Sequence, residues 1–408
     1  MNKFSELSLC SVLQSNLARH KFVQPTPVQT EAIPPALAGR DVVATAQTGT
    51  GKTLAFLLPM LESLLGKTGV SGVQAVILSP TRELAIQINE AFAQLSLGTG
   101  VRAAVVVGGL NETTQLRAIN KGAQVIIATP GRLCDFLNRK LVNLGNVRFF
   151  VLDEADRMLD MGFLPSIRIV LQAMPAARQT LFFSATIEKT VAHLIESHVK
   201  NPVRIAIGAS SQPVDLVDLR VYEVEQDCKV SLLTKILQDE PGSFLVFART
   251  KHGTDRLAKK LSAAGIKTGR IHGNRTQSQR NQVLSEFKDG GYRVLVATDV
   301  AARGIHVEGI AHVVNFDLPQ VPGDFIHRVG RTGRAGARGI ASTFNTRQER
   351  SEIRKIEREL SIRLVPQQVP TNLVRETKQA SKVIVMPDDT PKRPTSRFTP
   401  RKKFAGRW

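Results

Sequence analysis

Residues 46–53 read Ala46-Gln47-Thr48-Gly49-Thr50-Gly51-Lys52-Thr53, directly after an apolar run at Asp41–Ala46 and just before an amphipathic stretch. Glycines in such a loop let the backbone curl until its N–H groups point at phosphate oxygens, and a following helix adds its positive N-terminus. These residue types predict that Lys52 reaches the β- and γ-phosphates and that the Thr53 hydroxyl binds Mg²⁺. The usual phosphate-loop pattern begins with glycine where this chain has alanine, so a plain Gly-rich turn is the alternative.

An acidic element lies roughly 100 residues downstream of this loop. A buried-strand pattern, Phe149–Leu152, ends there in Asp153-Glu154-Ala155-Asp156. Because ligands bind at the carboxyl ends of parallel strands, these acids fit a nucleotide site in which Asp153 holds Mg²⁺ and Glu154 orients and deprotonates a water. The alternative is a solvated acidic helix start, since carboxylates stabilise helix N-termini.

Two segments of the chain alternate short apolar runs with helical stretches, such as Leu54–Leu65 and Arg82–Leu95. This pattern predicts an α/β class with parallel sheets covered by helices on both faces. The predicted strands are Asp41–Ala46, Ala75–Ser79, Ala103–Val107, Val125–Ala128, Phe149–Leu152, Thr180–Phe183 and Val203–Ile207, then Phe244–Ala248, Thr268–Ile271, Val294–Ala297, His312–Phe316 and Ile340–Phe344. We predict a first domain at 1–207, a flexible linker at 208–216, a second domain at 217–361 and a disordered basic tail at 362–408.

The composition is that of a globular protein with a basic surplus. The chain has 408 residues, 42% of them hydrophobic, and a formal net charge of +20, which favours a polyanionic partner, most often nucleic acid. Residues 361–408 hold 11 Lys or Arg against 3 Asp or Glu, so the tail is especially basic. The sequence shows no membrane-spanning run, no signal peptide and no zinc or disulfide pattern among its three cysteines. A cytoplasmic location is expected.

These residues make the sequence resemble the DEAD-box family of superfamily 2 ATP-dependent RNA helicases, whose name is spelled by Asp153–Asp156. The resemblance covers about residues 1–360, and the sequence of residues 25–53 is most similar to that of the bacterial RhlE-type group. It implies two tandem RecA-like domains, one ATP with Mg²⁺ per chain, and RNA as the partner. The second domain carries no phosphate loop of its own.

The resemblance also implies the members of the nucleotide site. A Q motif at residues 22–29 implies that Gln29 reads the adenine edge and that Phe22 stacks on the base; a simple core anchor is the alternative for Phe22. The other implied nucleotide contacts are Ala46, Gln47, Thr48, Gly49, Thr50, Gly51, Lys52, Thr53 and Asp299. Thr53 and Asp153 are the implied metal ligands, and the implied catalytic set is Glu154, Asp153, Lys52, Arg331 and Arg334, whose two arginines reach the γ-phosphate from the second domain.

The family's RNA contacts fall on loops at strand ends. The matching residues are Pro80, Thr81, Arg82, Gly109, Thr129, Pro130, Gly131, Arg132, Arg249, Gln277, Arg280 and Thr298. Hydroxyls, backbone N–H groups and arginines bind phosphate and sugar, which carry no base information, so sequence-independent binding is expected. For any one of these residues alone, a plain turn is as good an interpretation. Asp156, Ser184, Thr186 and His327 are implied to couple the ATP site to the RNA site, and Gln277 and Arg280 to take part in domain closure.

The sequence departs from the family pattern at two positions. Lys21 stands before Phe22 where the family usually has glycine, a change that a surface loop should tolerate. His306 stands where an aspartate is usual, so the negative charge is lost and altered nucleotide affinity or coupling is expected.

The expected function is RNA-stimulated ATP hydrolysis coupled to cleft closure, which unwinds short RNA duplexes or remodels ribonucleoprotein. RNA and ATP favour the same closed state, which is reciprocal positive coupling. An ATP-gated RNA clamp or annealer is one alternative, and a DNA translocase is another, because 2′-hydroxyl contacts cannot be read from sequence. Ribosomal or RNA-turnover complexes are family-level partners, and the chain is expected to be a monomer.

Overall fold

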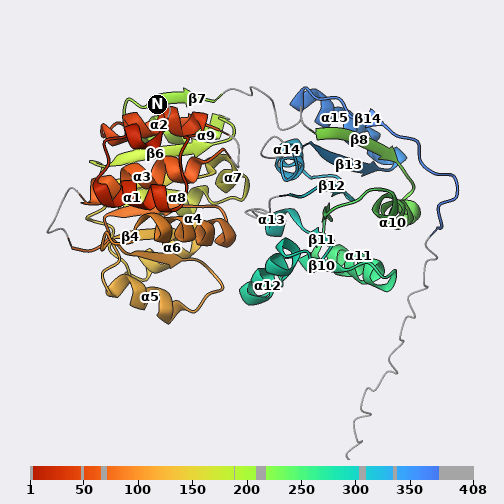
Figure 1. Ribbon diagram of the computed structural model, residues 1–408, viewed down its shortest axis with the longest axis horizontal. Coiled ribbons are helices and arrows are strands. Elements are labelled where there is room, and N and C mark those ends of the chain that lie inside the picture. The colour runs from red at the N-terminus through yellow and green to blue at the C-terminus, as the bar shows by residue number, and fades with distance from the viewer. Residues whose placement is uncertain are drawn as a thin grey trace, which may run out of the picture.

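The protein is described here by a computed structural model that covers residues 3–46, 50–65, 71–187, 189–207, 217–302, 309–333 and 338–375. Several predicted features lie outside the described residues: Gln47, Thr48, Gly49, the linker at 208–216, His306, Arg334 and residues 376–408 of the tail. Figure 1 shows two lobes, each built around its own sheet, with α7 (Ala155–Asp160) and α14 (Pro322–Val329) on the sides that face one another.

The first lobe contains a seven-stranded parallel sheet in the order β3-β4-β2-β5-β6-β1-β7. Its strands are β1 (Val42–Thr45), β2 (Ala75–Leu78), β3 (Ala103–Val106), β4 (Val125–Ala128), β5 (Phe149–Leu152), β6 (Gln179–Ser184) and β7 (Val203–Ala206). Each pair is parallel and in regular register, as where Val42 lies beside Leu181 and Val203. Parallel strands are joined by crossover connections and run in one direction, so the carboxyl ends of all of these strands lie at one edge of the sheet.

Helices cover both faces of this sheet because successive strand residues point to opposite sides. One face packs against η1 (Phe4–Glu6), α1 (Ser11–Arg19), α2 (Pro27–Leu37), α3 (Lys52–Leu65) and α4 (Arg82–Leu95). The other packs against α6 (Pro130–Asn138), α7, α8 (Leu164–Gln172) and α9 (Lys189–His198), and α5 (Glu112–Asn120) contacts β3. Along β5, Phe149 and Val151 enter the first core while Phe150 and Leu152 enter the second.

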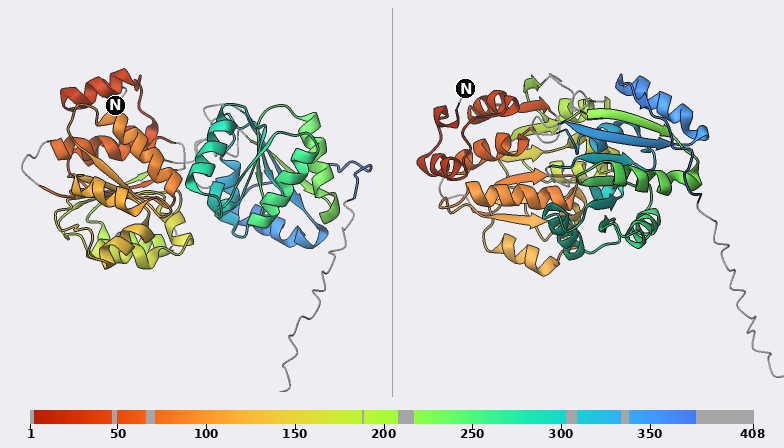
Figure 2. Two further views of the ribbon diagram at one scale, coloured as in Figure 1. Left: turned by 90° about the horizontal axis from the view of Figure 1, so that it is seen from below. Right: turned by 45° about the vertical axis from the view of Figure 1, so that its right-hand side comes forward.

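The second lobe repeats this plan with the strand order β10-β11-β9-β12-β13-β8-β14. Its strands are β8 (Val217–Glu223), β9 (Phe244–Phe247), β10 (Thr268–Ile271), β11 (Val294–Ala297), β12 (His312–Asn315), β13 (Gly339–Asn345) and β14 (Val365–Pro366). Its helices are η2 (Gln226–Cys228), α10 (Lys229–Asp239), α11 (Lys251–Ala263), α12 (Gln277–Lys288), α13 (Asp299–Ala302), α14, η3 (Arg347–Glu349) and α15 (Arg350–Leu360). The two further views show helices on both sides of each sheet (Figure 2).

The predicted class, α/β with two tandem parallel sheets, is confirmed, and every predicted strand is present to within a residue or two at its ends. The strand β8 was missed, because its alternating apolar and polar residues suit a half-exposed strand rather than a continuous apolar run. None of the helices in the parts of the chain that the structure describes is long and apolar enough to cross a membrane.

The predicted boundary of the tail at residue 361 is too early. The strand β14 pairs with β8, and Gln367 donates its backbone N–H to the Val221 carbonyl. Leu364 is buried in one core of the second lobe, and Leu373 packs on the other. Residues 362–375 therefore belong to the second domain, although their polar, proline-containing sequence did not predict an ordered segment.

Candidate nucleotide and RNA site

The site residues of the first lobe divide along the carboxyl edge of its sheet. The strands β5, β6 and β1 are neighbours, and they lead respectively into Asp153–Asp156, Ser184–Thr186 and the phosphate loop. The strands β3, β4 and β2 are also neighbours, and they lead into the loops predicted to contact RNA. The topology thus separates the predicted nucleotide half of the edge from the predicted RNA half.

The phosphate-loop lysine lies beside the first acidic residue of β5. Lys52 Nζ is 4.0 Å from Asp153 Oδ1 and donates to the Ala46 carbonyl at 3.0 Å, and both side chains are buried. Burial raises the pKa of Asp153 above its ordinary value, and Lys52 only partly offsets this. Asp153 Oδ1 is buried and accepts no hydrogen bond from any residue in the described ranges.

This unpartnered oxygen tests whether the residues present fit a bound Mg²⁺. A buried carboxylate oxygen without a donor is the hard oxygen ligand that Mg²⁺ prefers. Thr53, the first residue after Lys52 in α3, supplies a hydroxyl close by in the chain. The donor set of Asp153 and Thr53 therefore fits the ion.

Glu154 adopts a left-handed backbone conformation, with φ at 53°, where the chain turns from β5 into α7. Such a conformation is rare for a residue with a side chain and is concentrated at functional sites. Arg157 Nη1 donates to Glu154 Oε2 at 2.6 Å, and both side chains are buried. Burial alone would raise the pKa of Glu154, but Arg157, then Lys52 and Arg331, lower it below the usual range. The short contact with Arg157 therefore favours the carboxylate form of Glu154.

The predicted adenine reader, Gln29, lies against the phosphate loop. Its Oε1 accepts from the Thr26 backbone N–H at 2.8 Å, and its Nε2 donates to the Gly51 carbonyl at 2.9 Å. A side-chain amide has two acceptor sites and two donor hydrogens, so one of each is left for a base edge. Gly51 has φ of +90°, and a Cβ there would come within 2.5 Å of Gln29 Nε2, so only glycine fits. Phe22 is half-buried and packs on the first core, as the core-anchor alternative requires, and its stacking on the base stays a prediction.

The coupling residues predicted in the first lobe do meet. Asp156 Oδ2 accepts from the Ala185 and Thr186 backbone N–H groups at 3.0 and 2.9 Å and from Thr186 Oγ1 at 3.2 Å. Ser184 Oγ accepts from the Asp156 backbone N–H at 3.2 Å and donates to the Thr186 carbonyl at 2.7 Å. The end of β5 and the end of β6 are therefore tied together by hydrogen bonds.

Two predicted residues of the second lobe come near this carboxylate cluster. His327 and Arg331 line a small cavity together with Arg157 of the first lobe. Burial, and then the charge of Arg157, lower the pKa of His327, which favours the neutral ring. Arg331 is buried, and its positive charge contributes to the low pKa of Glu154. Asp299, a predicted nucleotide contact, instead binds Arg328 through both oxygens, at 2.6 and 2.7 Å.

The predicted RNA loops of the first lobe lie at the ends of β2, β3 and β4. Thr81 caps α4 by accepting from the Leu84 backbone N–H at 3.3 Å, and Thr129 and Pro130 begin α6. Arg82 lies against Gly109, where an added Cβ would come within 2.1 Å of its Nη1. The remaining members are Pro80, which is buried, Gly131, which is exposed, and Arg132, which pairs with Glu112 and Asp135. Pairing with acids is not an RNA contact, so the role of Arg132 stays a prediction.

Two predicted RNA contacts of the second lobe reach the first lobe. Gln277 Nε2 donates to Glu83 Oε1 at 3.0 Å, and Arg280 Nη2 pairs with the same oxygen at 3.0 Å. These contacts join the two lobes, as the role in domain closure implied for Gln277 and Arg280 requires. The other two contacts, Arg249 and Thr298, follow β9 and β11; Arg249 is exposed and lies 3.5 Å from Glu349.

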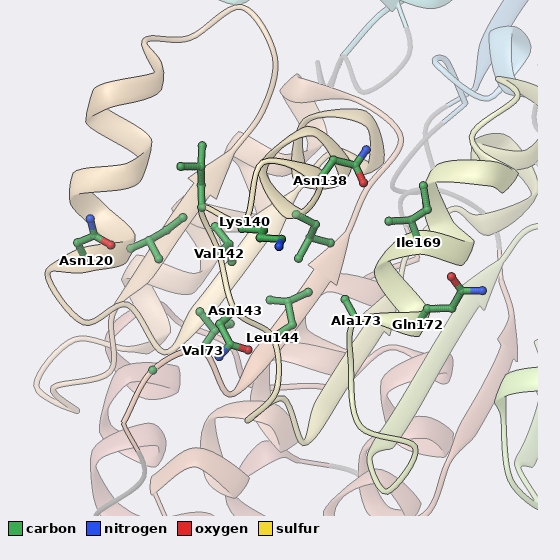
Figure 3. Close-up of a pocket in the computed structure, with 14 residues that line it drawn as sticks. Val73, Asn120, Asn138, Lys140, Val142, Asn143, Leu144, Ile169, Gln172 and Ala173 are labelled. Atoms are coloured by element: carbon green, nitrogen blue, oxygen red, sulfur yellow. The ribbon is translucent and has the colours of Figure 1, made fainter.

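Three residues that bind the site together were not singled out from the sequence: Glu83, Arg157 and Arg328. Each is next to a predicted site residue in the sequence, but the spacing does not show that Glu83 faces the other lobe or that the Arg157 side chain turns back onto Glu154. A groove of about 820 Å³ on the first lobe contains none of the predicted site residues. Figure 3 shows it lined from several elements by side chains such as Asn120, Asn138 and Gln172.

Comparison with known proteins shows the family of the chain. The DEAD/DEAH box helicase family matches residues 26–194, and the helicase conserved C-terminal domain matches residues 228–336. The ATP-dependent RNA helicase CshA of Listeria monocytogenes is 42% identical over 372 residues, 91% of this chain and 71% of that protein. This chain belongs to the DEAD-box family of ATP-dependent RNA helicases. The CshA of Geobacillus kaustophilus is 41% identical over 91% of this DEAD-box chain and 79% of its own.

Solved structures of DEAD-box proteins share the two-lobed fold. Dbp5 of S. cerevisiae bound to RNA and ADP BeF3 has a TM-score of 0.81 at 31% identity, covering 91% of this chain and 96% of that one. A DEAD box protein from Methanococcus jannaschii has a TM-score of 0.54 at 36% identity, covering 90% and 99%. The narrower likeness to the RhlE-type group stays a prediction.

Proposed function

We propose that this DEAD-box helicase hydrolyses ATP between its two lobes and uses closure of the lobes on an RNA strand to separate short duplexes or remodel ribonucleoprotein. The observation that carries the proposal is that Arg331 and His327 of the second lobe line one cavity with Arg157, whose Nη1 donates to Glu154 Oε2 at 2.6 Å. The buried pairs of Glu83 with Arg280 and Gln277 support it, because they join the lobes beside the loops predicted to contact RNA.

Each side chain has a defined part in the proposed reaction. Lys52 binds the terminal phosphates, and Arg331 brings positive charge to the γ-phosphate as hydrolysis proceeds; such an arginine typically contributes roughly 10³–10⁵ in rate. Glu154 orients the attacking water. As a general base, its carboxylate also accepts the proton that this water loses. Gln29 selects adenine through its remaining amide donor and acceptor.

Thr53 and Asp153 are the residues that would hold Mg²⁺. When bound there, the ion would neutralise charge on the β- and γ-phosphate oxygens. The unpartnered Asp153 Oδ1 supports this assignment.

RNA is proposed to bind across both lobes through its backbone. The loops after β2, β3 and β4 present hydroxyls, backbone N–H groups and Arg82, which suit phosphate and sugar. The TM-score of 0.81 with an RNA-bound relative, against 0.54 with the Methanococcus jannaschii protein, favours a lobe arrangement like that of the RNA complex. The basic segment at 376–408 is proposed to add salt-sensitive affinity. We also propose that the protein acts as a monomer in the cytoplasm, on ribosomal or RNA-turnover complexes.

One experiment separates this function from its alternatives. The ATPase rate is measured without nucleic acid, with RNA and with DNA, and strand displacement is followed in parallel. We expect RNA alone to stimulate hydrolysis, Lys52→Ala to lose ATP binding, and Glu154→Gln to bind ATP and RNA without turnover. Equal stimulation by DNA would favour a translocase, and RNA-stimulated hydrolysis without strand displacement would favour a clamp.

A further inference from the structure

A basic hollow on the second lobe lies apart from every residue predicted to bind nucleotide or RNA. Its volume is about 600 Å³, and it is formed by α11, the end of β10 and the start of α12. All of the described residues that line it are polar or charged. Four of them, Arg256, Lys259, Arg270 and Arg275, are positive, and one, Asp255, is acidic. The basic hollow therefore keeps a surplus of positive charge.

The acid of the basic hollow is already shared by several neighbours. Asp255 Oδ1 lies 3.0 Å from Arg270 Nε, 3.1 Å from His272 Nε2 and 3.9 Å from Arg275 Nη2. Asp255 stands four residues before Lys259 in α11, a spacing at which such side chains often pair, but its carboxylate meets β10 instead. One carboxylate cannot neutralise the whole cluster.

Two long cations of α11 are left without an acid. Arg256 and Lys259 are exposed, and neither forms an ion pair with any residue in the ranges that the structure describes. They stand three residues apart in the helix, so both lie on the face of α11 that borders the basic hollow. Cations with no partner inside the protein are free to replace the counterions of nucleic-acid phosphates.

The basic hollow continues the edge of the second sheet at which RNA is proposed to bind. The strands β9, β11 and β10 are successive neighbours, and the first two lead into the predicted RNA contacts Arg249 and Thr298. The Thr298 N–H donates to the carbonyl of Ile271, the last residue of β10, and Lys251 Nζ lies 3.5 Å from Asn274 Oδ1. RNA that contacts Arg249 and Thr298 therefore has the basic hollow beside it.

The chemistry of the lining favours a nucleic-acid backbone over a protein. Protein interfaces have apolar and aromatic centres, whereas no apolar side chain is among the described residues that line the basic hollow. Surfaces that bind nucleic acid are more polar and strongly positive. The ring of His272 is only 4% exposed, so it offers no platform on which a base could stack. Phosphates are therefore the groups that this hollow suits.

We propose that the basic hollow binds phosphates of RNA that continues beyond the segment held between the lobes. All of its cations belong to the second lobe, so this grip requires neither ATP nor contact between the lobes. It therefore adds the same factor to RNA affinity with and without ATP, and it leaves the hydrolysis step unchanged. RNA stays attached to the second lobe when the contacts between the lobes are lost. This inference rests on the proposed binding of RNA across both lobes.

The test is the double variant Arg256→Gln/Lys259→Gln in the full chain, at exposed positions where glutamine is a good helix former. We expect its Kd for a single-stranded RNA of about 20 nucleotides to rise roughly tenfold, by the same factor without nucleotide and with a non-hydrolysable ATP analogue. The slope of log Kd against log salt concentration should fall by about 1.4, as the loss of two phosphate contacts requires. The RNA-saturated kcat should change less than about twofold.

Controls isolate the charge and its position. Arg256→Lys/Lys259→Arg keeps both charges and should bind RNA as wild type does. Arg354→Gln/Arg358→Gln removes the same charge from exposed positions of α15, which lies at the other end of the second lobe from α11 (Figure 1), and should also bind as wild type. An RNA of about 6 nucleotides should lose less affinity for the double variant than the longer RNA, because it is too short to reach the basic hollow from the lobe interface.

The outcomes separate this inference from the proposed function. If RNA stimulates the wild-type ATPase but the double variant keeps its Kd and salt slope, the inference is wrong and the proposed function stands. If RNA does not stimulate the wild type, the proposed function fails, while the comparison of Kd values still decides whether the basic hollow binds RNA. An equal loss for short and long RNA, or a loss only with the ATP analogue, would overturn a flanking site. Unchanged RNA binding with lost binding of polyglutamate would assign the hollow to an acidic protein instead.

Discussion

Arg280 of the second lobe and Glu83 of the first form a buried ion pair, with Nη2 3.0 Å from Oε1. Gln277 donates to the same Glu83 oxygen at 3.0 Å, so one carboxylate oxygen serves two donors of α12. Removing one member of a buried pair leaves the other charge uncompensated, which is more harmful than never having had the pair. The contact therefore favours the arrangement in which the lobes touch.

Weakening this pair should weaken the response to RNA. We expect Glu83→Gln to raise the RNA concentration needed for half-maximal ATPase about tenfold, in the range typical of coupling energies, while the ATP affinity measured without RNA is unchanged. The measurement is an RNA titration of the ATPase rate. Arg354→Met, at an exposed position of α15, is the control. An unaltered titration curve for Glu83→Gln would show that the pair does not contribute to closure.

The hydrogen bonds between Asp156 and Thr186 should link hydrolysis to strand separation. Thr186→Val removes the 3.2 Å hydroxyl contact but keeps the 2.9 Å backbone contact to the same oxygen. We expect RNA-stimulated hydrolysis to fall less than about threefold, while the strand displacement completed per ATP falls several-fold more. Both are measured on one preparation. A parallel loss of the two activities would contradict a coupling role.

Replacing Lys21 by glycine should stabilise the protein. Lys21 has φ of 58° in a motif that ends α1, where Phe22 N–H donates to the Leu17 carbonyl and Lys21 N–H to that of Ala18. A left-handed conformation costs a residue with a side chain about 1 kcal/mol that glycine avoids. We expect Lys21→Gly to raise Tm by a few degrees in a thermal melt. Lys259→Gly, at an exposed site inside α11, should lower it instead.

The second lobe should lose stability in acid because of His312. Burial lowers the pKa of His312 to about 3, and the ring stacks on Phe244 and meets Ser342 Oγ at 2.9 Å. Below its unfolded value of about 6.5, the unfolded chain binds a proton that the folded chain refuses, so the free energy of unfolding falls as pH drops from 6.5 towards 3. His312→Gln should flatten this dependence by up to one proton, about 1.4 kcal/mol per pH unit, in urea titrations at several pH values. If the free energy of unfolding depends on pH with the same slope in both proteins, His312 is not the cause of the acid sensitivity.

Much of the fold and of the nucleotide site could be predicted because the informative residues are local in sequence. Strands such as Val125–Ala128 and Val294–Ala297 are continuous apolar runs, and a parallel sheet puts every following loop at one edge. Lys52 and Asp153 could therefore be expected to lie close together, and Lys52 Nζ is 4.0 Å from Asp153 Oδ1.

The remainder depends on contacts between distant segments. Nothing near Glu83 in sequence shows that Gln277 and Arg280 approach it, since they are almost 200 residues away. The strand β8 was missed because its exposed residues interrupt the apolar pattern, and β14 because a two-residue strand has almost no pattern. The left-handed turn at Lys21 was read only as a tolerated departure, since φ is not visible in a residue name.

We propose that the first lobe holds the nucleotide and that the second lobe completes the catalytic site through Arg331. The sharpest test is single-turnover ATP hydrolysis at saturating RNA, compared between wild type and Arg331→Ala. We expect the variant to bind ATP and RNA but to hydrolyse ATP about 10³-fold more slowly. Hydrolysis by Arg331→Ala within a few-fold of the wild-type rate would show that Arg331 does not complete the site.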